Sequence, residues 1–155
     1  MHQVSFQRTR RVAGAAVAAT VAALAVAAAP ATAAKTYRET VVATVKKASQ
    51  KGSTLVYTGT VRSSVAGTGT VRQTVRLNGL NVTGSFVIRY KGGTIRGTVR
   101  ARAKLGLKEA TFTGTSRTTG GTGRFKGATG SGSYRGTGAL NMSSATFRST
   151  GTITF

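Results

Sequence analysis

The chain has 155 residues, a length that suits one domain; 23 are lysine or arginine and two are acidic, which gives a formal net charge of +21. It has no cysteine or aspartate, and its one histidine, His2, lies at the N-terminus. Disulfides, metal sites of cysteine and histidine, and Ser-His-Asp or Cys-His nucleophiles all need residues that the rest of the chain lacks. We therefore expect no metal and no cofactor.

Residues 1–33 are predicted to be a helical signal peptide. Arg8, Arg10 and Arg11 form a positive region, residues 12–29 are almost wholly Ala and Val, and small residues follow Pro30 as far as Ala33. Signal peptidase reads this order of segments. A retained transmembrane helix is the alternative, although the stretch is short and weakly apolar for one. The mature chain is then secreted or extracytoplasmic, without a stable membrane span, and its charge is 23 − 3 − 2 = +18.

From Thr36 onward the hydrophobic pattern has a period of two, with abundant Thr and Val and with Gly as punctuation. This pattern predicts strands and no helices. Turn-forming pairs such as Asn78-Gly79 and Gly92-Gly93 separate the strands. We expect eight strands, at residues 36–47, 53–62, 67–77, 82–91, 94–105, 110–118, 131–140 and 145–155.

Within single strands one face is aliphatic, aromatic or glycine, and the other is threonine and arginine. In the fifth strand, for example, Ile95 and Val99 alternate with Arg96 and Arg100. Such a strand belongs to an antiparallel sheet with one dry and one wet face. Because an open sheet of eight strands leaves two edges unpaired, we predict a closed eight-stranded antiparallel β-barrel over residues 34–155. A two-sheet sandwich is the alternative.

Glycines recur on the inward face, and they admit two interpretations. They can bend strands and make room for bulky neighbours, or they can leave space for a ligand. The glycines concerned are Gly59, Gly69, Gly97, Gly114, Gly136 and Gly151.

A glycine-rich segment joins the sixth and seventh strands. Its glycines permit left-handed backbone, Phe125 is suited to plug one barrel end, and Ala128 fits where a larger side chain would clash. A phosphate cradle is the alternative, but the run lacks the Gly-Lys-Ser/Thr ending of a P-loop. The structural loop residues are Gly120, Gly121, Gly123, Phe125, Gly127, Ala128 and Gly130.

The run Gly-Gly-Thr-Gly-x-Phe-x-Gly-Ala-x-Gly between two late strands resembles the allene oxide cyclase barrel superfamily. That superfamily includes plant allene oxide cyclases, dirigent proteins and many exported bacterial proteins, and the similar region spans residues 67–155. The resemblance implies an eight-stranded antiparallel barrel, in agreement with the strand count. It also implies an apolar cavity with a carboxylate in its wall, a position for which this chain offers only Glu39.

Strand parity predicts which side chains face the interior. Glu39 is the one tentative catalytic residue; alternatively it lies near the barrel mouth and pairs with an arginine. With a single acid and no histidine to assist it, we expect the interior to be filled or narrowly hollow. The predicted ligand-lining aromatic residues are Tyr37, Tyr57, Phe86, Tyr90, Phe112, Tyr134 and Phe147.

The charge and the fold together favour a non-catalytic exported barrel that binds an anionic envelope or extracellular partner, or a small apolar ligand. A cofactor-free cyclase or isomerase acting on an apolar substrate is the alternative. Specific nucleic-acid binding is not expected, because the aromatic residues face inward and form no stacking platform. An ice-binding surface is disfavoured because arginines interrupt the threonine rows, and a membrane-spanning barrel because aromatic girdles are missing.

Exported material is expected to begin at Ala34 or within a few residues of it, because the small residues before that position suit signal peptidase. Mass spectrometry of the secreted protein measures this directly. An exported chain that still carries residues 1–33 would contradict the prediction.

Overall fold

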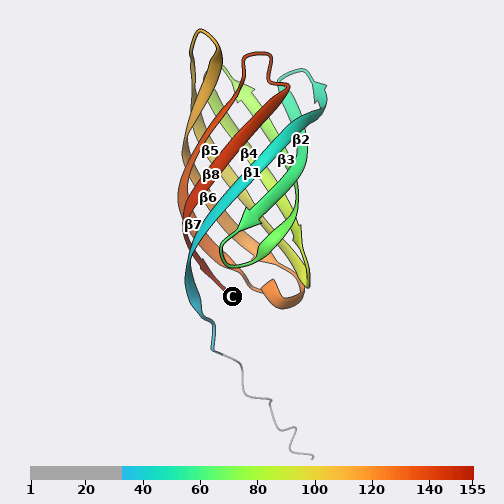
Figure 1. The fold of residues 1–155 in the computed structure, drawn as a ribbon, viewed down its shortest axis with the longest axis vertical. Coiled ribbons are helices and arrows are strands. Elements are labelled where there is room, and N and C mark those ends of the chain that lie inside the picture. The colour runs from blue at the N-terminus through green and yellow to red at the C-terminus, as the bar shows by residue number, and fades with distance from the viewer. Residues whose placement is uncertain (1–32) are drawn as a thin grey trace, which may run out of the picture. The chain divides into compact units, whose positions relative to one another are not determined.

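The computed structural model describes residues 33–155, and the predicted signal peptide lies outside these residues except for Ala33. Eight strands form one closed antiparallel barrel in which each strand pairs with the next and the last pairs with the first (Figure 1). The predicted barrel is thereby confirmed, and the sandwich alternative is wrong. The elements are β1 (Thr36–Lys51), β2 (Thr54–Ser63), β3 (Gly67–Asn78), β4 (Asn81–Tyr90), β5 (Gly93–Leu105), β6 (Glu109–Gly121), the 3-10 turn η1 (Gly123–Phe125), β7 (Thr129–Ala139) and β8 (Ser144–Thr154).

Two strands, β1 and β6, run three or four residues past their predicted ends. In β1 a bulge between Lys47 and Ser49 shifts the register, and pairing with β2 then continues to Lys51. A bulge adds one residue without ending the ladder, but it breaks the period of two on which the prediction depended. In β6 the strand continues to Gly121, which pairs with Ile95. Within residues 33–155, no helix is long and apolar enough to cross a membrane.

The strands are strongly staggered around the barrel. A path that starts at Glu39 and follows paired residues from strand to strand returns to β1 at Gln50, not at Glu39. It passes through Gly151, Gly132, Ser116, Val99, Gly84, Val75 and Leu55. The offset along β1 is 50 − 39 = 11 residues, the bulge included. A stagger of this size requires strands that tilt steeply against the barrel axis.

Because consecutive strands are antiparallel, alternate turns lie at the same end of the barrel. The turns β1–β2, β3–β4, β5–β6 and β7–β8 gather at one end, the upper one in Figure 1. The turns β2–β3 and β4–β5, the η1 connection and the C-terminus gather at the other. We call them the leucine end and the plug end, after residues described below.

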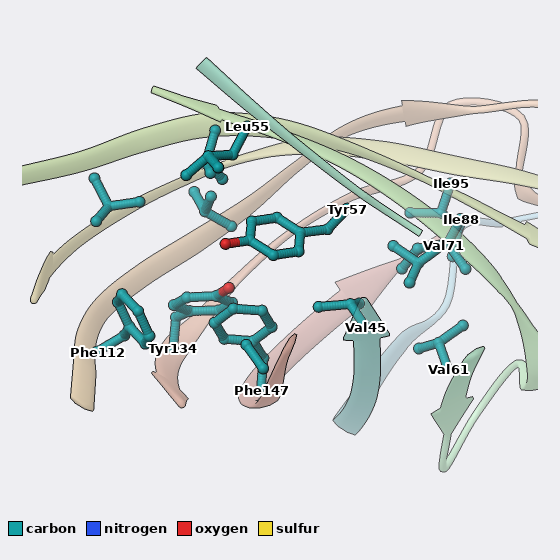
Figure 2. Packing of buried hydrophobic residues seen from close by; sticks show 14 of the residues in the cluster. Val45, Leu55, Tyr57, Val61, Val71, Ile88, Ile95, Phe112, Tyr134 and Phe147 are labelled. Atoms are coloured by element: carbon teal, nitrogen blue, oxygen red, sulfur yellow. The ribbon is translucent and has the colours of Figure 1, made fainter. Parts of the chain in front are cut away.

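The interior is filled mainly by aliphatic and aromatic side chains from every strand. An aromatic group stands on one side, where the Tyr134 and Phe147 rings stack at 5.0 Å between centroids and Phe112 packs on Phe147 at 5.8 Å. An aliphatic group that includes Val71, Ile88 and Ile95 lies apart from it (Figure 2). Burial of these side chains is the main source of stability in a domain without disulfides.

The inward glycines lie where neighbouring strands approach one another too closely for a side chain. A Cβ at Gly97 would meet the Phe86 ring at 2.5 Å, and one at Gly69 would meet the Tyr90 ring at 2.8 Å. Both aromatic residues are cross-strand partners of these glycines. A Cβ at Gly151 would collide with the backbone of β7. Of the two interpretations of these glycines, the structure therefore favours the structural one.

Replacing Gly97 by alanine is expected to destabilise the barrel by about 1–3 kcal/mol, because the added methyl group overpacks a site already occupied by a ring and a carbonyl oxygen. The matched control is Ser85→Ala in the adjacent strand. Ser85 is exposed on the outer face, so its free energy of unfolding should change by less than about 0.5 kcal/mol. Denaturant unfolding of both variants makes the comparison, and equal effects would show that Gly97 is not under steric constraint.

Candidate functional site in the lumen and on the outer wall

The plug end of the barrel is closed by the glycine-rich connection. Phe125 is fully buried and contacts the Tyr90 and Phe155 rings at centroid distances of 5.6 and 5.0 Å. Arg124 stacks over Phe125 at 4.6 Å and donates a hydrogen bond to the carbonyl of Ala66 in the β2–β3 turn at 3.0 Å. The connection is thus tied to the β2–β3 turn at the same end of the barrel.

Backbone conformation and close packing explain why this connection is built from small residues. Gly123 and Gly127 have φ values of +59° and +77°, in the left-handed region that other residues rarely adopt. Gly120 and Gly121 end β6, Gly130 belongs to β7, and Ala128 is fully buried. The segment therefore builds the plug, with no feature that singles it out as a phosphate cradle.

Between the plug and the aromatic group lies a cavity of about 80 Å³. This volume has room for a few waters, and it is smaller than the roughly 150 Å³ that accommodates benzene or the roughly 300 Å³ of a typical ligand pocket. The interior is narrowly hollow. The cavity's wall combines aliphatic and aromatic side chains with the carboxyl of Glu39, the amide of Gln73 and several hydroxyl groups.

The cavity lies beside Glu39 because the strands next to β1 on one side carry small residues at this level. Along the ladder from Glu39 the next partners are Gly151 on β8, Gly132 on β7 and Ser116 on β6. None of them fills the space in front of the carboxyl. Sequence parity predicted an inward Glu39, but not that small residues on three successive strands would leave room around it.

Glu39 is half-buried and is held by a serine rather than an arginine. Ser63 Oγ donates to Glu39 Oε1 at 2.5 Å and accepts hydrogen bonds from the backbone N–H groups of Val65 and Ala66 at 3.1 and 2.9 Å. Within residues 33–155, the contacts of this carboxyl do not include the arginine partner that was the alternative expectation. Burial raises the pKa of Glu39, and the Ser63 hydrogen bond opposes part of that rise.

The Tyr90 hydroxyl is buried beside this pair without a hydrogen-bond partner. Burial raises the pKa of Tyr90, and the neighbouring Glu39 charge adds to the rise. Ser63 lies near enough to oppose part of the rise in the pKa of Tyr90. The serine oxygen already donates once and accepts twice, however, which uses its full capacity. A neutral O–H that faces a cavity without a partner is a position where a water or a small acceptor can bind.

Two further polar pairs lie inside the lumen. Gln73 donates to the Tyr134 hydroxyl at 3.1 Å, and the hydroxyls of Ser116 and Ser149 lie 2.7 Å apart. Sequence analysis missed Ser63, Gln73, Ser116 and Ser149 as site residues. Because Gln73 shares strand parity with Val71 and Val75, the sequence alone contained the signal that this polar side chain faces inward. The pairing of the serines depends on register, which the sequence does not specify.

The predicted lining residues fall into three groups. Phe86, Tyr90, Tyr134 and Phe147 line the cavity, whereas Tyr57 and Phe112 are buried in the core without lining it. Tyr37 does not lie in the lumen: it is 37% exposed and packs on Phe155 at 5.3 Å. The reason is that the first residues of β1 pair only with β8, since pairing with β2 begins at Val41.

The outer wall carries most of the arginines, and on most strands threonines occupy the neighbouring outward positions. Register places Arg62 opposite Val42, Val42 opposite Arg148, and Arg148 directly opposite Arg135. The same ladder continues through Thr113 to Arg102. We call Arg62, Arg148, Arg135 and Arg102 the arginine row. Successive members of the row stand either on adjacent strands, about 5 Å apart, or on alternate strands, about 10 Å apart.

Of the two carboxylates in residues 33–155, neither stands among these arginines. Glu39 lies inside the barrel, and Glu109 is exposed at the leucine end, where β6 begins. Residues 33–155 contain no group of three or more His, Cys, Asp or Glu side chains that could hold a metal ion.

No family model matches the chain, and no curated protein matches it. Among solved structures, a pyocyanin demethylase is similar at 16% sequence identity and a TM-score of 0.37, over 74% of this chain and 98% of that one. The assignment of the fold rests on the strand pairing itself.

Glu39→Gln is expected to stabilise the protein at neutral pH and to leave its stability unchanged in acid. A carboxyl with a raised pKa in the folded state stays protonated while the unfolded chain ionises, so stability falls as pH rises from about 4.5 through the raised value. The glutamine avoids this loss and still accepts from Ser63. Residues 34–155 contain two glutamates and no histidine, so few other side chains titrate in this range.

Denaturant unfolding at pH 3.5 and pH 7 measures the effect. The exposed Glu109→Gln is the control and should show no comparable difference between the two pH values. A Glu39→Gln variant that is less stable than the parent at pH 7 would mean that the carboxylate is favourably bound, contrary to the argument from burial.

Proposed function

We propose that the protein is an exported, non-catalytic barrel that binds anionic polymers of the cell envelope or exterior through its outer arginine wall. The observation that carries the proposal is the pair Arg135 and Arg148, which stand directly opposite each other on adjacent strands. Like charges in this position destabilise a sheet by about 0.2–1 kcal/mol. An anionic partner that bridges the two guanidinium groups removes this repulsion.

The neighbours of the pair support the same function. Arg62 and Arg102 extend the row on either side, and exposed threonines alternate with arginines on the strands between. Guanidinium groups bind phosphate, sulfate or carboxylate in a bidentate manner, and threonine hydroxyls add neutral donors. A row that crosses several strands suits an extended polymer better than a single small anion.

The size of the lumen supports binding over catalysis. A cavity of about 80 Å³ is too small to enclose an apolar substrate of typical size. Membership of the allene oxide cyclase superfamily is part of the proposal. It is supported by the strand number and by the Gly-Gly-Thr-Gly-x-Phe loop, whose Phe125 closes the barrel.

A cofactor-free isomerase or cyclase is the second candidate. The observation that favours it is Glu39, a half-buried carboxyl of raised pKa that shares a cavity with the unpartnered Tyr90 hydroxyl. These two groups are suited to move a proton on a small substrate. A Glu39→Gln variant that stays folded but loses a measured conversion would establish this activity.

Polymer binding by the arginine row is tested with a double variant in which Arg135 and Arg148 are both replaced by glutamine. On immobilised heparin the variant should elute at lower salt, and the slope of log K against log salt should fall by about 2 because two ionic contacts are lost. The matched control replaces Lys91 and Lys126 with glutamine, which removes the same charge from the plug end.

If attraction depends only on net charge, the two double variants will behave alike, and the proposal of a binding wall fails. Thermal unfolding gives a second readout. Without polymer, the Arg135 and Arg148 variant should be slightly more stable than the parent, because the like-charge pair has been removed.

A further inference from the structure

The leucine end of the barrel carries exposed leucines on three neighbouring turns. Leu80 lies in the β3–β4 turn, Leu105 ends β5, Leu107 lies in the β5–β6 turn, and Leu140 lies in the β7–β8 turn. Their exposed fractions are 43%, 58%, 99% and 43% in that order. The remaining large hydrophobic residues exposed in residues 33–155 are Tyr37 at the plug end and Val87 on the wall.

Backbone contacts hold these turns beside one another. The N–H of Ala103 on β5 donates to the carbonyl of Leu80 at 2.7 Å, and Glu109 at the start of β6 pairs with Ala139, the residue before Leu140. The β5–β6 turn, with Leu107, reaches furthest at the upper end of Figure 1. The four leucines thus lie on or beside neighbouring turns at one end of the barrel, and we call this group the apolar tip.

Lysines surround this tip, whereas arginines cover the wall. Lys104 and Lys108 flank the β5–β6 leucines, and the β1–β2 hairpin contributes Lys46, Lys47 and Lys51. One exposed acid, Glu109, stands among these five cations. The plug end of the described barrel does not combine exposed leucine with lysine. Its turns carry Lys91 and Lys126 beside glycine, threonine and the buried Phe125.

We infer that the leucine end docks onto an anionic lipid bilayer, with the leucines inserted below the headgroups and the lysines among them. Exposed apolar residues rimmed by cations match the two layers of such a surface: hydrocarbon below, anionic headgroups above. A polyanion in water attracts the lysines but gives no reason for a leucine that is 99% exposed. This surface is separate from the arginine row, and the inference does not depend on the proposed polymer binding.

Insertion is measured with a fluorescent residue, because the chain has no tryptophan. Residues 34–155 contain every strand pair of the closed barrel and its buried core, so they form the test protein. In Leu107→Trp the emission should shift to the blue on vesicles of mixed phosphatidylglycerol and phosphatidylcholine, and brominated acyl chains should quench it. The matched control Val87→Trp places the same residue on the wall, and its emission should not change.

Binding is measured by co-sedimentation with the same vesicles. Leu107→Ser should weaken partitioning about tenfold, since an aliphatic side chain no longer leaves water. Replacing Lys104 and Lys108 with glutamine should weaken it about tenfold as well, and more than the same change at Lys91 and Lys126. Elution of Leu107→Ser from heparin should match the parent, which separates this inference from the arginine wall.

Three results would overturn the inference. The first is a Leu107→Trp emission that stays unchanged on anionic vesicles or is no better quenched than that of Val87→Trp. The second is equal vesicle binding by the two lysine double variants. The third is a self-associated parent that Leu107→Ser converts to monomer without loss of vesicle binding, because a second copy of the chain would then be what covers the tip.

Discussion

Inward-facing glycines let the backbones of neighbouring strands approach so closely that a side chain there would strike a carbonyl oxygen or an aromatic ring. The steep stagger of the eight strands depends on this approach, and with it the closure of the barrel. The same close packing narrows the lumen. Space remains mainly beside Glu39, where Gly151, Gly132 and Ser116 follow one another across three strands. Glycine therefore determines both that the barrel closes and where it stays open.

A narrow lumen leaves no room for charge, so nearly every ionisable side chain must lie outside. Glu39 is the exception, and Ser63 supplies the hydrogen bond that a buried carboxylate needs. Twenty cationic side chains then share an outer surface with a single glutamate, Glu109. Such a surface destabilises the compact state through self-repulsion. Strand pairing that closes around the barrel provides the stability that tolerates this repulsion.

Strand parity was sufficient to predict the strands, the closed barrel and most inward aromatic residues, because alternation along a strand is a local property. Tyr37 was misplaced because parity does not show where a strand leaves the closed part of the barrel. The partner of Glu39 was also misjudged. Ser63 reaches it diagonally across β1 and β2, and that contact depends on register, which no pattern within one strand determines. The leucine end was not predicted, since turns far apart in sequence meet there only after the barrel has closed.

The chemistry of the two cation types agrees with the division of the outer surface. Arginine presents a planar fork that grips an anion from a fixed direction, and on a rigid wall its stem is held by the strand beneath. Lysine carries a hydrated point charge on a flexible stem, which can extend from an apolar surface to reach headgroups above it. If the two types served only to raise the net charge, either would suit either place. Instead every arginine in residues 33–155 but Arg124 stands on a strand, and most of them stand along the wall, although some, such as Arg62 and Arg89, come close to strand ends. The lysines gather toward the two ends of the barrel. The two cationic surfaces therefore lie at different positions along the barrel axis; both are positively charged, but they differ in chemistry. A molecule that docks by its leucine end keeps its outer arginines free for a second anionic partner.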